Sequence, residues 1–219
     1  MTINKRALIL VDMSVEQVED LHYQKAAVID NCRQLVSSCR NKDDTGSVFD
    51  LVIDSRLWLS SPEDCPSLAR VWPNTGTGLF VAGSQGAGLI DELQKISKHH
   101  LVTFSAKYNY SCFANGAGNN QNCQLPSLLE EHEISEVYIA GINTDYCVFA
   151  TALDAFQWIR PSGRDGSPAK PRTLSKVIVV SDAVSSVRGK AAHEEGLRNI
   201  ERHFGPDALM TTKQVLELV

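Results

Sequence analysis

The stretch Val137-Tyr138-Ile139-Ala140-Gly141-Ile142-Asn143-Thr144-Asp145-Tyr146-Cys147-Val148 decides how the chain folds. Its first four residues favour a buried strand, Gly141 breaks that strand, and residues 147–156 have the composition of a helix. Cys147 therefore lies at a strand-to-helix turn. With Thr144 as the N-cap, its hydroxyl would accept from the Cys147 N–H, and the helix macrodipole would lower the pKa of the thiol. A small buried structural cysteine is an equally good interpretation of this stretch alone.

Charged residues follow three further apolar strands. Asp12 follows residues 7–11, Asp54 follows residues 48–53, and Lys107 stands two residues beyond the strand predicted at 100–105. Because parallel strands end at one edge of a sheet, where ligands of such folds bind, these side chains and Cys147 share one predicted site. Further strands are predicted at residues 177–180 and 208–210, and helices at about 23–39, 89–98, 125–131, 189–204 and 215–218.

Strand and helix alternate along the whole chain, and the strands are apolar on both faces. This pattern predicts a three-layer αβα sandwich around a mainly parallel, six-stranded sheet. A chain of 219 residues fits one domain spanning residues 1–219. Turn-like or irregular segments are predicted at residues 41–47, 55–86 and 111–122, and a surface insertion at 162–172. The segment 55–86 is long enough to predict a functional role.

Composition limits the class of partner. A net charge of -5 argues against nucleic acid and anionic membranes, so a small-molecule ligand is expected. The N-terminal residues carry no apolar leader and no run reaches the length of a membrane span, which predicts a cytoplasmic protein. The six cysteines form no CxxC pair and the six histidines no HExxH motif, so neither a metal site nor another cofactor is predicted.

Three sequence segments together resemble one family. They are residues 10–13 around Asp12, Lys107 followed by Tyr110-Ser111-Cys112-Phe113, and residues 141–148 around Cys147. They resemble the isochorismatase-like cysteine hydrolases, which include nicotinamidases, N-carbamoylsarcosine amidohydrolases and isochorismatases. Residues 144–148 look most like the nicotinamidase version, and members of this superfamily are commonly oligomeric, so a homo-oligomer is expected.

The resemblance implies a mechanism. Asp12 would take the thiol proton, Lys107 would hold that carboxylate, and Cys147 would attack an amide carbonyl to give a thioester that water hydrolyses. It also implies a cis peptide bond between Ile142 and Asn143. The backbone N–H groups of Asn143 and Cys147 would then form the oxyanion hole.

The sequence differs from that of nicotinamidases at the residues that bind their metal. These enzymes bind a metal through one Asp and two His, and Asp54 matches the Asp, whereas Arg56 and Thr75 stand where the histidines should be. Arginine cannot serve as a neutral nitrogen ligand, so a metal-independent reaction is expected. Arg56 either pairs with Asp54 or binds a substrate carboxylate. The substrate pocket is expected to use Asp54 and Arg56 together with Trp72, Tyr110 and Phe113, although each aromatic residue also fits a core position.

These features predict a cysteine hydrolase of a small amide or related C–N bond, acting through a Cys147 thioester. Two alternatives stay open. One is a catalytically idle family member that acts as a binding or scaffold protein, and the other is an isochorismatase-type hydrolase.

Overall fold

A computed structural model describes residues 4–39, 47–98, 100, 102–116, 123–159 and 174–218. Its centre is a six-stranded sheet in the order β3-β2-β1-β4-β5-β6, and every neighbouring pair is parallel. The strands are β1 (Arg6–Val11), β2 (Leu51–Leu57), β3 (Val102–Lys107), β4 (Glu136–Ile142), β5 (Lys176–Ser185) and β6 (Leu209–Met210). The predicted parallel six-stranded sheet is confirmed.

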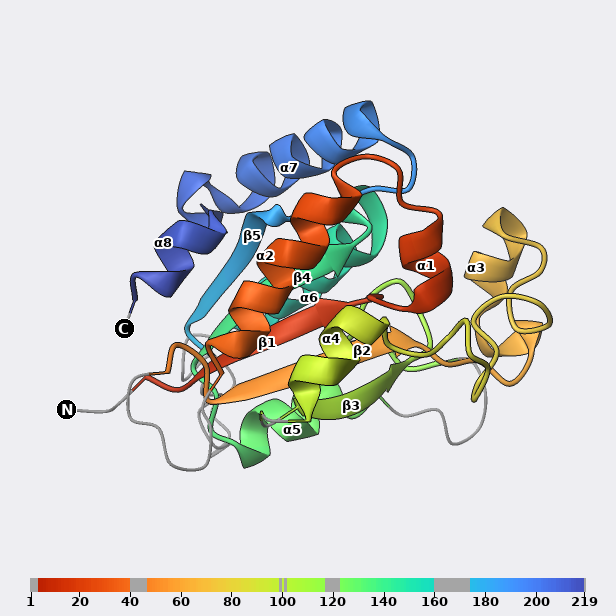
Figure 1. The fold of residues 1–219 in the computed structure, drawn as a ribbon, viewed down its shortest axis with the longest axis horizontal. Coiled ribbons are helices and arrows are strands. Elements are labelled where there is room, and N and C mark those ends of the chain that lie inside the picture. The colour runs from red at the N-terminus through yellow and green to blue at the C-terminus, as the bar shows by residue number, and fades with distance from the viewer. Residues whose placement is uncertain are drawn as a thin grey trace, which may run out of the picture.

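Helices cover both faces of the sheet. They are α1 (Val15–Glu19), α2 (Lys25–Ser37), α3 (Pro66–Val71), α4 (Asp91–Ser97), α5 (Leu125–Glu131), α6 (Phe149–Trp158), α7 (Lys190–Phe204) and α8 (Thr212–Leu216). Figure 1 shows α2 and α4 in front of the sheet and α6 behind it. Short turns of helix lie at η1 (Pro62–Asp64), η2 (Thr144–Val148) and η3 (Pro206–Ala208), and η2 is a π-helical turn.

The alternation of side chains along β1 divides the core in two. Leu8 and Leu10 pack with residues of α2, α4 and α8, whereas Ile9 and Val11 pack with residues of α5, α6 and α7. All four side chains are fully buried. This explains why the strand reads as a continuous apolar run, since both of its faces meet helices.

Four predicted strand ends are wrong. β4 continues through Gly141, which was predicted to break it, to Ile142, and β5 continues past residue 180 to Ser185. β2 continues past Asp54 to Leu57, and β3 includes Lys107, because the two strands stay in register through the pair Leu57 and Lys107. The charged residues inside β2 and β3 are tolerated there because each pairs with an opposite charge: Asp54 with Arg56, and Lys107 with Asp12. The segment predicted as irregular at 55–86 also contains η1 and α3, and α1 was not predicted.

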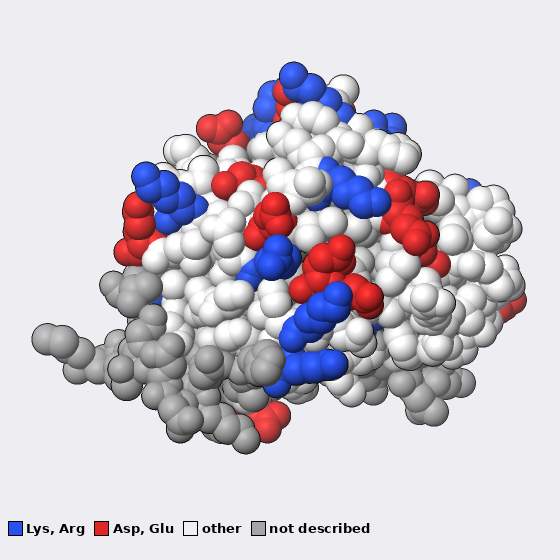
Figure 2. All heavy atoms as spheres, in the orientation of Figure 1, with Lys and Arg blue, Asp and Glu red and all other residues white. Residues whose placement is uncertain are grey.

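Some predictions fall outside the described residues. These are the surface insertion at 162–172, most of the turn at 41–47, and residues 117–122 of the segment at 111–122. Within the part of the chain that the structure describes, no helix is both long and apolar enough to cross a membrane. Figure 2 shows basic and acidic side chains interspersed on the face that carries α2, without a large patch of one sign.

Candidate active site

β1 and β3 bring Asp12 and Lys107 together. Asp12 follows the last residue of β1 with a φ of 52°, and its N–H donates to Ser55 O at 2.8 Å. Its Oδ1 accepts from the N–H of Leu57 at 3.1 Å, and its Oδ2 lies 2.5 Å from Lys107 Nζ. Lys107 Nζ also donates to the carbonyl of Tyr110 at 3.3 Å. The carboxylate and the ammonium are thus fixed by backbone groups of neighbouring segments.

β4 and η2 bring Cys147 to the same place. The peptide bond between Ile142 and Asn143 is cis, as the resemblance implied. The Val148 N–H donates to Asn143 O at 2.9 Å, five residues back, which is the bond that makes η2 a π turn. Such turns are frequent at functional sites. Cys147 is buried within this turn, and Asp12 and Lys107 are both within hydrogen-bonding reach of its thiol.

The predicted lowering of the thiol pKa is wrong for this structure. Burial raises the pKa of Cys147, Lys107 lowers it, and Asp12 raises it further, with a net rise above the ordinary value. The predicted N-cap is also wrong, because Asn143 precedes η2 and the Thr144 hydroxyl meets His193 Nδ1 at 2.9 Å. The turn therefore holds a neutral thiol that must be deprotonated when it reacts.

The lysine stays charged in this buried place. Burial lowers the pKa of Lys107, but the carboxylate of Asp12, through its charge and its hydrogen bond, together with smaller effects of the neighbouring cysteine sulfurs, more than offsets that effect, so the pKa of Lys107 is raised. A permanent cation is therefore held between a carboxylate and two thiols. This cation stabilises negative charge both on the Asp12 carboxylate and on the Cys147 sulfur. Transfer of the thiol proton to the carboxylate requires both groups to carry negative charge in turn.

Asp54 and Arg56 form a separate buried pair on β2. Arg56 Nε donates to Asp54 Oδ1 at 2.8 Å, and Nη1 donates to the carbonyl of Ala87. The guanidinium lies over the ring of Phe104, 4.9 Å from its centroid. Strand alternation places Arg56 and Lys107 on opposite faces of the sheet. Of the two roles predicted for Arg56, the structure shows the pairing with Asp54.

This pairing does not fit a bound metal ion. A cation at Asp54 would have to displace a guanidinium that already neutralises the carboxylate, and Arg56 offers donors only. Thr75, at the other histidine position, is buried. Across the described residues, no three His, Cys, Asp or Glu side chains are grouped to hold a metal.

Two of the three predicted aromatic pocket residues pack against Tyr146, the residue that precedes Cys147. Trp72 and Tyr110 have ring centroids 6.5 Å apart, and both contact Tyr146, at 5.9 and 5.8 Å. The proximity of Tyr110 to Cys147 contributes to a raised pKa of Tyr110, after burial as the largest cause. We call Trp72, Tyr110 and Tyr146 the aromatic wall. Phe113 instead packs against Trp158 of α6, with centroids 5.6 Å apart.

Sequence reasoning missed several contacts of the turn. Tyr146 joins the aromatic wall, and the Arg188 guanidinium lies 5.5 Å from its ring centroid and 3.4 Å from the carboxylate of Asp145. The N–H of Val187 donates to Asn143 Oδ1 at 2.9 Å. The contact of Tyr146 could have been predicted, because Tyr146 directly precedes Cys147 in the sequence. The contacts of Val187 and Arg188 could not, because the loop before α7 carries no motif that relates it to the turn.

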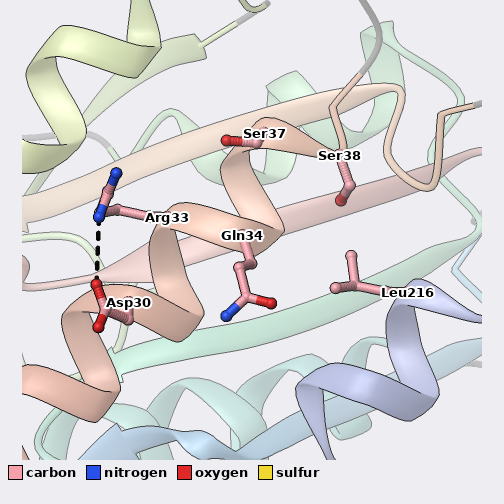
Figure 3. A pocket seen from close by; sticks show the side chains of 6 residues that line it. All are labelled: Asp30, Arg33, Gln34, Ser37, Ser38 and Leu216. Carbon is pink, nitrogen blue, oxygen red and sulfur yellow. Dashed lines mark hydrogen bonds and ion pairs between the residues drawn. The ribbon is translucent and has the colours of Figure 1, made fainter.

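A surface hollow of about 530 Å³ lies elsewhere, between α2 and α8. Figure 3 shows that Asp30 and Arg33 on its wall pair with each other, at 3.2 Å. Neither the residues predicted for catalysis nor those predicted for substrate binding line this hollow. The chemistry of the chain is therefore expected at the strand ends.

Comparison with known proteins gives concordant findings. A sequence model of the isochorismatase domain matches residues 6–214. The nicotinamidase of Escherichia coli is 45% identical over 49 residues, which cover 22% of this chain and 22% of that protein. The matches to curated relatives thus span less than half of their length.

Solved structures extend the similarity to the whole fold. A cysteine hydrolase from Pseudomonas syringae pv. phaseolicola is 19% identical, with a TM-score of 0.72 over 99% of this chain and 94% of that one. The N-carbamoylsarcosine amidase from Thermoplasma acidophilum is 21% identical, with a TM-score of 0.62 over 95% and 96% of the two chains. At these identities the similarity is one of fold.

Proposed function

This chain belongs to the isochorismatase family, whose members are hydrolases, amidases included, and we propose that it hydrolyses a small-molecule amide through Cys147. The observation that carries the proposal is the buried contact of Asp12, Lys107 and Cys147, which three different strands deliver to one point. A buried ion pair beside a buried thiol is costly to maintain for stability alone, whereas an acyl-transfer reaction needs such an arrangement.

In the proposed first half-reaction, Asp12 accepts the proton of Cys147 and the sulfur attacks the amide carbonyl. The C–S bond forms, the carbonyl oxygen gains negative charge, and the N–H groups of Asn143 and Cys147 are proposed to stabilise it. The C–N bond then breaks, and the proton held by Asp12 passes to the leaving nitrogen. The product is a thioester on Cys147 and a free amine or ammonia.

In the second half-reaction, water gives a proton to Asp12 and adds to the thioester. The C–S bond breaks, the acid leaves, and the proton returns to the sulfur, so that the neutral thiol is restored. Lys107 keeps its charge throughout and holds the carboxylate in place. No step uses a metal ion, since Arg56 occupies the carboxylate of Asp54. The aromatic wall is proposed to hold the acyl part of the substrate.

Ammonia release from a panel of small amides tests this proposal. The panel contains nicotinamide, pyrazinamide, N-carbamoyl compounds and ureido acids, each with and without EDTA. We expect turnover that survives EDTA, is abolished in Cys147→Ser, and persists in Cys32→Ala, whose thiol is buried on the other face of the sheet. Turnover that EDTA abolishes would contradict metal independence. Equal turnover in Cys147→Ser would exclude the cysteine mechanism. Absence of ammonia release from every amide of the panel would favour the catalytically idle or the isochorismatase-type alternative.

A further inference from the structure

The nucleophile turn has a buried polar contact that the proposed chemistry does not use. Thr144 Oγ1 lies 2.9 Å from His193 Nδ1, and the two residues are 49 positions apart in the sequence. Thr144 is fully buried and His193 nearly so. A hydroxyl and an imidazole that are removed from water together need each other as partners, because an unpaired buried polar group is costly.

The contact belongs to a close approach of α7 to η2. A Cβ atom built on Gly196 would fall 2.8 Å from the carbonyl carbon of Thr144 and 2.9 Å from the nitrogen of Asp145. Gly196 is one helical turn after His193, so both residues face η2 from the same side of α7. The glycine lets the helix backbone touch the turn, and the histidine makes the polar contact beside it.

His193 acts here as a neutral group. Burial lowers its pKa, while the charges of Glu194 and Asp145 raise it by less, so the imidazole is uncharged at neutral pH. Its ring also lies 5.5 Å from that of Tyr23, which restricts its rotation. A neutral, sterically fixed imidazole can hold the orientation of the Thr144 side chain without placing a charge beside the nucleophile turn.

Resting on the function proposed above, we propose that His193 is a positioning residue, which fixes η2 through Thr144 and so sets where the Cys147 sulfur lies. Thr144 opens η2, directly after the Ile142–Asn143 peptide, and Cys147 follows three residues later. Loss of this contact would therefore remove a restraint on the backbone at the start of the turn that carries the nucleophile. A displacement of about 1 Å can cost about 100-fold in rate, even when the displaced group itself does no chemistry.

Four variants separate positioning from packing. His193→Leu keeps an apolar bulk but loses the hydrogen bond, whereas His193→Asn keeps a polar atom near the place of Nδ1. Thr144→Val is isosteric and loses the hydroxyl, and Thr144→Ser retains it. Glu195→Gln, exposed on the same helix, serves as the control. Each protein is compared at equal concentration of folded active sites, so that loss of stability does not count as loss of rate.

On a substrate from the panel, we expect His193→Leu and Thr144→Val each to lower kcat by about 10- to 100-fold, with KM changed by less than about threefold. His193→Asn and Thr144→Ser should restore most of the rate. The double variant His193→Leu/Thr144→Val should be no slower than either single variant, because both remove one contact. Multiplicative losses, no loss at all, or a loss that His193→Asn does not restore would overturn the proposal.

A second measurement does not depend on finding a substrate. The rate at which iodoacetamide alkylates Cys147, followed on its peptide by mass spectrometry, reports the placement and protonation of the thiol. If Cys147 is positioned by this contact, His193→Leu and Thr144→Val change that rate by the same factor, while Glu195→Gln leaves it unchanged. If no amide of the panel releases ammonia and the two variants alkylate like wild type, this inference fails together with the proposed function. If no amide releases ammonia but the two variants change the alkylation rate of Cys147, only the proposed reaction fails.

Discussion

Lys107 Nζ lies 2.5 Å from Asp12 Oδ2, and the side chains of both residues are excluded from solvent. Neither charge can be hydrated, so each is tolerable only because the other is present. The backbone N–H of Leu57 satisfies the second carboxylate oxygen, which ties the pair to β2. The pair thus connects three strands, and its removal should affect stability and activity differently.

Removing one member of this pair should be costly. We expect Lys107→Met to lower the free energy of unfolding at pH 7 by about 3–5 kcal/mol, because Asp12 remains as an unpaired buried carboxylate. The double variant Asp12→Asn/Lys107→Met should recover most of that stability and still lack activity. Urea unfolding measures the first effect and the amide assay the second. Lys213→Met, which removes an exposed 3.9 Å pair with Glu217, is the control and should change little. A single variant as stable as this control would contradict the argument.

The pH dependence of Cys147 follows from its burial. Since the thiol pKa is raised in the folded protein, the free protein should alkylate at Cys147 more slowly than an exposed thiol at pH 7–8.5, with the rate rising only above that range. Stability should change in the same sense. Below the ordinary thiol pKa both states are protonated, and above it only the unfolded chain ionises, so the folded state loses stability as pH rises.

Each thiol that stays protonated in the folded state should contribute a slope of about 1.4 kcal/mol per pH unit above that point. Cys147→Ala should reduce the slope of the free energy of unfolding against alkaline pH by the contribution of one thiol, as measured by urea unfolding at several pH values. Cys32→Ala, which removes a buried thiol whose pKa is raised to about 12, gives a matched comparison. Rapid alkylation of Cys147 below pH 7 would instead mean that Lys107 outweighs burial and that the resting protein holds a thiolate.

The sheet and the three central residues could be predicted because their signals are local. Continuous apolar runs indicate parallel strands, and parallel strands bring their C-terminal ends to one edge, which predicts that Asp12, Lys107 and Cys147 converge. The same argument wrongly placed Asp54 with them, because β2 continues beyond Asp54, whose side chain pairs with Arg56 on the other face of the sheet. The exact strand ends could not be predicted, since β2 and β3 continue only because backbone pairing through Leu57 and Lys107 outlasts the apolar run.

The missed features depend on distant partners. The hydrogen bond of Thr144 to His193 needs the approach of α7, and local capping rules instead assign that hydroxyl to the turn itself. The direction of the Cys147 pKa shift depends on burial, which the helix macrodipole argument does not include. Likewise, the sequence left two roles open for Arg56, because the further contacts of its guanidinium, with Phe104 and the carbonyl of Ala87, come from residues distant in the sequence.

The pairing of Arg56 with Asp54 gives a prediction about selectivity. Arg56→Met should lower the free energy of unfolding by about 3–5 kcal/mol at pH 8, because a buried carboxylate loses its partner. The loss should be smaller at pH 5, since burial already raises the pKa of Asp54 and lets it take up a proton. The ratio of kcat/KM for acidic and neutral amides should stay within about threefold of wild type. A tenfold drop in preference for acidic amides would place Arg56 at the substrate, and Arg56→Lys, which keeps the charge, is the control.

Gly141 provides the sharpest steric prediction, because it lies beside the strand that carries Asp12. Its φ is +116°, and a Cβ there would fall 2.1 Å from the carbonyl oxygen of Val11. Gly141→Ala should therefore force β1 and β4 apart and lower the free energy of unfolding by more than about 4 kcal/mol. Gly205→Ala is the matched control, since Gly205 has a φ of +88° with no atom within 4 Å of the added Cβ. It should cost only about 1–3 kcal/mol, for backbone conformation alone. Urea unfolding compares the two variants, and equal losses would mean that backbone conformation rather than contact with Val11 fixes glycine at position 141.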